Sequence, residues 1–229
     1  MIIYIGLDDT DVIGSPGTGH LARLLAGFLA ESYPLLGVTR HQLLEDSRVR
    51  CTKKNSSAGI MLDVPDGFEI QSIYPEIERM IVSSSAAGSD PGLCITSYVP
   101  PDIIEFGYQA KRILVNQQSA RELAHRHHII LHGLGGDESG IIGALAAVGL
   151  DAEGNDGRYV LIGQSRTLMG LQPITALIKA GISGVQTFDG KPVLEGDVLT
   201  DQLRPARRNS KPIAVVEWAG TYWIPLKLD

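Results

Sequence analysis

Apolar and polar positions alternate along the chain in blocks that predict a mixed order of strands and helices. Apolar runs at 2–7, 35–44 and 58–64 are typical of buried strands, whereas apolar residues recur at helical spacing across 18–32 and 68–82. The order strand, helix, strand, strand, helix predicts an α/β (α+β) fold, a sandwich of ferredoxin-like type.

Small, polar and turn-forming residues fill 83–92 and indicate a boundary after these elements. We therefore expect a first sandwich domain over 1–88 and a second one, also ferredoxin-like, over 89–229. From Val185 onward the pattern changes and predicts a small C-terminal β-element docked on the second domain. Helices are expected over 100–114, 117–127 and 140–150, and strands over 93–98, 159–162, 213–218 and 221–226.

Three carboxylates, Asp8, Asp9 and Asp11, directly follow the first apolar run. Clustered carboxylates repel one another unless a cation screens them, and Mg²⁺ prefers such oxygen ligands and bridges to phosphate. Alternation at the end of a strand sends Asp9 and Asp11 to one side and Asp8 to the other, so the first two form the better metal pair. The alternative is an acidic turn that only caps the next helix, although capping needs a single Asp.

The loop after the carboxylates places Gly17 and Gly19 on either side of Thr18, where the first helical pattern begins. Amides of such a loop and of a helix start can bind phosphates. The Thr18 hydroxyl can cap the helix, contact a phosphate or act as a nucleophile. Together with the carboxylates, the loop predicts a site for ATP and Mg²⁺, with Thr18 and Asp9 as the catalytic candidates.

A local excess of positive charge precedes the third predicted strand, in a chain of net charge −6. Arg48, Arg50, Lys53 and Lys54 surround Cys51 there. Such a cluster can hold the γ-phosphate or an anionic substrate, and Arg does so with bidentate geometry. A solvated surface loop is an equally good interpretation of this segment.

A glycine-rich stretch, 133–144, leads into the last predicted helix of this region. Gly140 and Gly143 can let a ligand approach the backbone near a helix N-terminus, which favours anions. The spacing matches neither a P-loop nor a dinucleotide-binding fingerprint. Close packing of the helix is the alternative use of these glycines.

Composition narrows the class of protein. The chain has 229 residues, 44% of them hydrophobic, which is typical of a folded globular protein. The net charge argues against a protein that mainly coats nucleic acid. Two cysteines exclude a Cys-rich zinc module or a disulfide framework, and the apolar stretch 21–38 is interrupted by Arg23 and Glu31. We expect a cytoplasmic protein with no membrane span.

These motifs together resemble the N-terminal half of the archaeal isoleucine-tRNA agmatinylcytidine synthetase family (TiaS). The family has Asn-Pro-Gly where this chain has Asp90-Pro91-Gly92, and the other matches keep the family's order and similar spacing. They are Gly6-Leu7-Asp8-Asp9-Thr10-Asp11, Thr18 within Gly17-Thr18-Gly19, and the stretch from Gly140 to Gly149; the family has a threonine next to Thr18 where this chain has Gly19.

The resemblance implies a kinase-like domain that binds ATP and Mg²⁺ through the acidic motif, followed by a ferredoxin-like domain. It also implies a role in phosphorylation for Thr18, since the family activates a cytosine carbonyl with phosphate before agmatine displaces it. The family continues into an OB-fold and a zinc ribbon that recognise tRNA, and we expect both to be absent here. Contact with tRNA is therefore left open.

The function expected from these features is ATP- and Mg²⁺-dependent transfer of phosphate to, or activation of, a small or nucleoside-like acceptor held between the domains. A homodimer is left open. A second interpretation is a metal-dependent phosphohydrolase with Asp9 as its nucleophile, because Asp9-Thr10-Asp11 also follows a buried strand. A third is a non-catalytic nucleotide sensor.

Overall fold

A computed structural model describes residues 1–201 and 203–228 and divides the chain into two compact units, Met1–Glu153 and Gly154–Asp229. The last residue of the expected second domain, Asp229, lies outside the described residues. Each unit has its own hydrophobic core.

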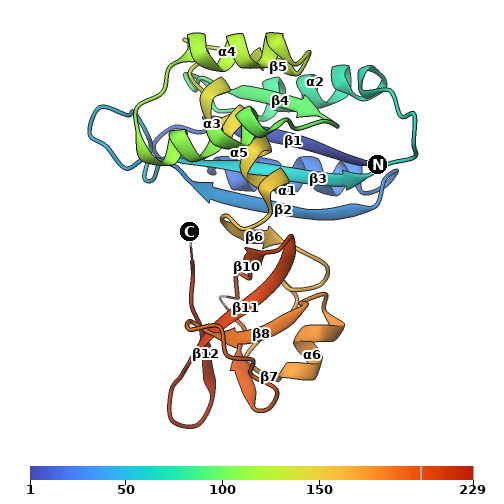
Figure 1. Cartoon of the computed structure of the whole chain (residues 1–229), viewed down its shortest axis with the longest axis vertical. Coiled ribbons are helices and arrows are strands. Elements are labelled where there is room, and N and C mark those ends of the chain that lie inside the picture. Colours follow the sequence, from blue (N-terminus) through green and yellow to red (C-terminus); the bar gives the residue numbers. More distant parts are fainter. Residues whose placement is uncertain (202, 229) are drawn as a thin grey trace. The chain divides into compact units, whose positions relative to one another are not determined.

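The first unit is built on a sheet in which neighbouring strands run antiparallel, in the order β5-β4-β1-β3-β2 (Figure 1). Up to β4 the elements follow the order β-α-β-β-α-β, and the central strand order 4-1-3-2 is that of a ferredoxin-like split βαβ arrangement. The α+β class is therefore confirmed. The elements are β1 (Ile2–Asp8), α1 (Thr18–Leu29), β2 (Leu35–Gln42), β3 (Ser56–Asp63), α2 (Tyr74–Ser84), β4 (Gly92–Thr96) and β5 (Ile130–Gly133).

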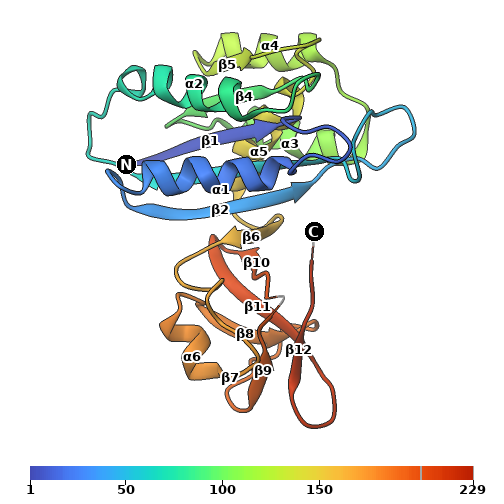
Figure 2. The ribbon, with the colours of Figure 1, turned by 180° about the vertical axis from the view of Figure 1, so that it is seen from behind.

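The two faces of β1 differ as the period of a strand requires. Ile3, Ile5 and Leu7 are fully buried and share one face of the strand. On the other face, a Cβ on Gly6 would lie 1.9 Å from the carbonyl oxygen of Ala144, so glycine permits a helix to approach. Helices α1 and α2 cover one side of the sheet (Figure 2), and α5 (Ile141–Glu153) covers the other.

Helix α5 is the centre of the larger core, because it packs against β1, β3 and β4 on one side and against α3 on the other. A Cβ on Gly149 would lie 2.3 Å from the carbonyl oxygen of Ile103, so the two helices meet at backbone distance. This second helical layer consists of α3 (Pro101–Arg112) and α4 (Gln117–Arg126).

The division after Glu153 differs from the boundary expected near residue 88. Strand β4 pairs with β1 in register, with Asp8 opposite Gly92, and α5 packs on the same sheet. Residues 92–153 therefore complete the first unit, because burying the far face of its sheet requires them. The predicted helix over 68–82 is interrupted, and an η1 turn (Ile70–Ser72) precedes α2, which has Pro75 in its first turn.

The second unit is mainly β-structure, with the strand order β6-β10-β11-β12-β9-β7 and with β8 parallel to β11. Its core gathers apolar residues such as Leu177, Val198 and Val216. Strands β11 and β12, where strands were expected over 213–218 and 221–226, pair antiparallel as a hairpin. The elements are β6 (Arg158–Leu161), β7 (Leu171–Pro173), α6 (Ile174–Lys179), β8 (Gly184–Thr187), β9 (Asp197–Leu199), β10 (Ala206–Arg208), β11 (Lys211–Trp218) and β12 (Trp223–Pro225).

Among the described residues, none of the helices combines the length and the apolar character that crossing a membrane demands.

Candidate functional site

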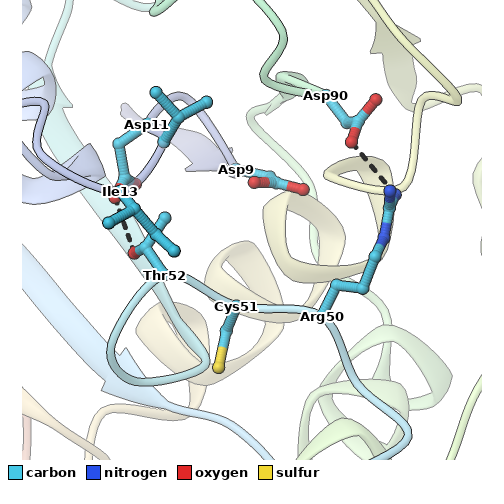
Figure 3. A pocket seen from close by; sticks show the side chains of 8 residues that line it. Asp9, Asp11, Ile13, Arg50, Cys51, Thr52 and Asp90 are labelled. Atoms are coloured by element: carbon cyan, nitrogen blue, oxygen red, sulfur yellow. Dashed lines mark hydrogen bonds and ion pairs between the residues drawn. The ribbon is translucent and has the colours of Figure 1, made fainter.

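A pocket of about 400 Å³ lies in the first unit, where β1 ends. Its walls come from the loop after β1, the loop between β2 and β3, and the residues just before β4. Figure 3 shows Asp9 between two groups of side chains. The lining residues are Asp9, Asp11, Val12, Ile13, Arg50, Cys51, Thr52 and Asp90.

Asp9 stands at the point where the chain leaves β1, and its φ of 52° lies in the left-handed region that Asp tolerates better than most residues. Its Oδ2 accepts a hydrogen bond from the Ser139 hydroxyl at 3.3 Å. Burial raises the pKa of Asp9, and the nearby carboxylates of Asp90 and Asp11 raise it further, against the opposing effects of Ser139 and Arg50. A cation in the pocket would relieve this repulsion.

Asp11 holds the start of α1. Gly17, the N-cap residue, has no side chain, and Asp11 Oδ1 accepts instead from the Thr18 N–H at 3.2 Å and the Thr18 hydroxyl at 3.1 Å. The Thr18 hydroxyl oxygen in turn accepts hydrogen bonds from the N–H and the hydroxyl of Thr10, at 3.2 and 3.1 Å. The Thr52 hydroxyl donates to the other carboxylate oxygen of Asp11, Oδ2, at 2.7 Å. We call Thr10, Asp11 and Thr18 the closed side of the pocket, because Thr10 and Thr18 are buried.

Asp8 lies on the opposite face of β1, against α5. A Cβ on Gly143 would lie 1.7 Å from Asp8 Oδ2, and Asp8 Oδ1 accepts from the Asp9 N–H at 2.8 Å. Burial raises the pKa of Asp8 well above its ordinary value. Within residues 1–201 and 203–228, no three His, Cys, Asp or Glu side chains are grouped as metal ligands, so the predicted trio does not converge on one point.

The basic segment separates into residues with different partners. Arg50 Nη2 donates to Asp90 Oδ2 at 3.0 Å and also to Asp137. We call Arg50, Asp90 and Asp137 the open side of the pocket, since the Arg50 side chain is 71% exposed. Arg48 instead pairs with Asp46 at the surface, Lys54 lies 3.4 Å from Glu45, and Lys53 is exposed. Cys51 is exposed at the pocket.

The glycines of the segment 133–144 make room for protein atoms. A Cβ on Gly140 would lie 2.5 Å from the Asp90 carbonyl oxygen, and one on Gly136 would lie 1.6 Å from Asp90 Oδ1. Gly143 likewise accommodates the Asp8 carboxylate. The structure therefore favours the packing role over the ligand role that was predicted for Gly140 and Gly143.

Gly17 and Gly19 occupy the start of α1, next to the pocket loop. Gly17 is exposed and Gly19 is partly buried, and a Cβ at either position would first meet another atom at 4.0 Å. These two glycines thus leave open space around the backbone, unlike Gly140 and Gly143.

Sequence reasoning missed three contributors to the site: Asp90 as a pocket carboxylate, Asp137 as its neighbour, and Thr52. Asp90 reaches Asp9 because its N–H donates to the Asp9 carbonyl at 3.1 Å, just before the β1–β4 ladder begins. The only local signal was the turn sequence Asp90-Pro91-Gly92, which is common in loops of every kind.

An α+β unit that collects carboxylates and an arginine from separate loops into one pocket has the features of a site for a charged small ligand. Sequence comparison confirms the resemblance to the N-terminal part of TiaS. The chain is 27% identical over 154 residues to tRNA(Ile2) 2-agmatinylcytidine synthetase TiaS of Methanopyrus kandleri, and 26% identical over 163 residues to that of Cenarchaeum symbiosum.

These matches cover 64% and 65% of this chain but 33% of each relative, so the chain spans about a third of the length of the curated relatives it matches. No family model matches the chain. Among solved structures, the TiaS–tRNA(Ile2)–ATP complex is similar with a TM-score of 0.57 at 20% identity, over 65% of this chain and 36% of that one. The TiaS–tRNA(Ile2)–AMPCPP–agmatine complex gives 0.55 at 19% identity, with the same coverage. The structural similarity shows the shared fold.

Proposed function

We propose that the pocket at the end of β1 binds ATP with Mg²⁺, and that this unit transfers phosphate to, or activates, a nucleoside-like acceptor. The observation that carries the proposal is the pocket itself, which gathers Asp9, Asp11, Asp90 and Arg50 from three separate loops. Its volume of about 400 Å³ lies in the range of small-molecule sites. Similarity to TiaS, whose complexes include ATP, supports the choice of nucleotide.

Asp9, Asp11 and Arg50 each have a part in this proposal. Asp9 and Asp11 would hold the metal ion, and the repulsion that raises the pKa of Asp9 fits a site that a cation completes. Bound there, Mg²⁺ would neutralise the charge of the phosphates. Arg50 would contact the terminal phosphate, and the open backbone at Gly17 and Gly19 would offer amides to it.

Thr18 is proposed to accept phosphate, with Asp11 taking its proton. The Thr18 hydroxyl already donates to Asp11 Oδ1 at 3.1 Å, which is within reach for a general base. In the transfer, the Thr18 oxygen would form a bond to the γ-phosphorus while the bond to the β–γ bridging oxygen breaks and its electrons stay on ADP. Thr18 is 6% exposed, so the closed side must open before this step.

The acceptor follows from the relatives alone. TiaS structures contain tRNA(Ile2), ATP and agmatine, so a cytidine in a tRNA is the first acceptor to test with this chain. Lys53 and Lys54 lie on the loop that lines the pocket and would meet a polyanion approaching it.

Isothermal titration with ATP and Mg²⁺ tests the site. Asp9→Asn keeps the shape of the side chain but removes the charge, and we expect it to abolish measurable Mg²⁺-dependent binding. Asp46→Asn is the matched control, because Asp46 pairs with Arg48 on the surface. Binding that survives Asp9→Asn unchanged contradicts the proposal.

Turnover assays separate the alternatives. Hydrolysis of an aryl phosphate without ATP would favour a phosphohydrolase with Asp9 as nucleophile, and tight nucleotide binding with no turnover over hours would favour a sensor. Mass spectrometry after incubation with ATP tests Thr18 directly, with Thr18→Ala as the unmodified reference.

A further inference from the structure

The Arg50 guanidinium lies between two carboxylates on the open side of the pocket. Its Nη2 donates to Asp90 Oδ2 at 3.0 Å and to Asp137 Oδ2. A guanidinium carries five N–H donors in a rigid fork. Within the part of the chain that the structure describes, the side-chain bonds of Arg50 all leave from this one nitrogen. The donors on Nε and Nη1 therefore remain for a ligand.

The two carboxylates that hold Arg50 are not equivalent. Asp90 is 15% exposed, its Oδ1 accepts the Asp137 N–H at 2.7 Å, and the missing side chain of Gly136 makes room for it. Asp137 is 55% exposed, and its Oδ1 accepts the Ser139 N–H at 3.0 Å. Solvent screens the exposed pair, so an incoming anion displaces Asp137 from Arg50 more readily than it displaces Asp90.

Asp137 is ionised at neutral pH. Hydrogen bonding from Ser139 and the charge of Arg50 hold its pKa below the ordinary value. Its negative charge therefore competes with a phosphate for the same guanidinium, at the edge of the same pocket.

We propose that Asp137 sets the affinity of the site: it occupies Arg50 in the empty pocket, and the terminal phosphate of a nucleoside triphosphate replaces it while Asp90 keeps the guanidinium in place. This inference rests on the proposed function, because it assigns a phosphate to the pocket. It adds a residue outside the pocket lining that tunes binding by competition.

Titration of the full chain with ATP and Mg²⁺ tests the competition. Asp137→Asn keeps an Oδ1 acceptor for the Ser139 N–H and removes the charge, and we expect it to lower Kd by roughly twofold to fivefold. Glu138→Gln is the matched control, since it removes one charge from the neighbouring position of the same loop, where Glu138 pairs with Arg121. We expect Glu138→Gln to leave Kd unchanged.

A double-mutant cycle makes the test specific. Arg50→Ala should raise the Kd for ATP. Adding Asp137→Asn to Arg50→Ala should not change that Kd further, because the guanidinium for which Asp137 competes is then absent. Urea unfolding of each variant checks that the fold is intact, and Asp137→Ser repeats the test if the Asn variant unfolds.

The outcomes distinguish this inference from the proposed function. If wild type binds ATP and Asp137→Asn binds it with the same Kd, the competition is contradicted, but the proposed ATP site is not. Equal tightening by Glu138→Gln, or tightening that persists without Arg50, also overturns it, because the effect is then general electrostatics. If neither wild type nor Asp137→Asn binds ATP, the proposed function fails, and the inference fails with it.

Discussion

The closed side of the pocket is held by buried hydrogen bonds, whereas the open side is held by exposed ion pairs. On the closed side, buried Thr18 donates from its N–H and its hydroxyl to Asp11 Oδ1 at 3.2 and 3.1 Å, and its hydroxyl oxygen accepts from Thr10. On the open side, Arg50 pairs with Asp90 and Asp137 at the solvent boundary. Breaking buried hydrogen bonds leaves unpaired groups and is costly, whereas solvent weakens exposed ion pairs. The closed side therefore fixes the geometry of the site, and the open side can exchange partners with a ligand.

Thr18→Val should give the largest loss of stability, because it removes the hydroxyl that links Thr10 to Asp11 and leaves buried polar groups unpaired. We expect the free energy of unfolding to fall by about 1–3 kcal/mol in urea denaturation. Thr167→Val, at an exposed Thr whose hydroxyl donates to the Gln164 carbonyl, is the control and should change it by less than about 0.5 kcal/mol. Equal effects of the two changes would show that the closed side is not a structural centre.

Asp9 lies between the two sides of the pocket. Its charge should lower the stability of the fold, whereas the Thr18 hydroxyl raises it. Its pKa is raised in the folded state by burial and by Asp90 and Asp11, so the folded protein binds a proton more tightly than the unfolded chain does. Stability from this group is therefore present below the ordinary pKa of 3.8 and is lost as pH rises through the raised value.

Asp9→Asn should consequently raise the free energy of unfolding at neutral pH, and its advantage over wild type should disappear in acid. Urea denaturation at a series of pH values measures this difference. Addition of Mg²⁺ should stabilise wild type and leave Asp9→Asn unaffected. A variant that is less stable than wild type at neutral pH would contradict the unfavourable charge assigned to Asp9.

Arg50→Ala should give the smallest change in stability, although it weakens nucleotide binding. Its guanidinium is mostly exposed, so we expect a loss of less than about 1 kcal/mol in the free energy of unfolding. Thermal and urea unfolding provide the measurement. A loss as large as that of Thr18→Val would remove the distinction between the closed side and the open side.

The sequence predicted the elements of the first unit well, because strand and helix patterns there are strong and local. Strand β5 was missed, since it is short and forms by pairing with β4. The extent of the unit was also missed, because the pairing of β4 with β1 joins segments far apart in the chain. The same pairing brings Asp90 to Asp9, which no local pattern indicates.

Gly140 and Gly143 show where the sequence left two roles open. Gly140 and Gly143 lie in a stretch whose composition suits phosphate binding, yet their missing side chains accommodate backbone near Asp90 and the carboxylate of Asp8. A sequence shows that a side chain is absent. It does not show whether a ligand or the protein fills the space.

Residues close together in the chain were sufficient to reveal the first strand, the helix that follows it and the dense negative charge between them, because backbone preference and charge repulsion act over short range. The partner of each charge depended on the folded arrangement. Asp11 caps α1 while also lining the pocket, Asp8 faces α5, and Asp9 lines the pocket beside Asp90. Desolvation and pairing are properties of neighbours in space, and strand register brings those neighbours together.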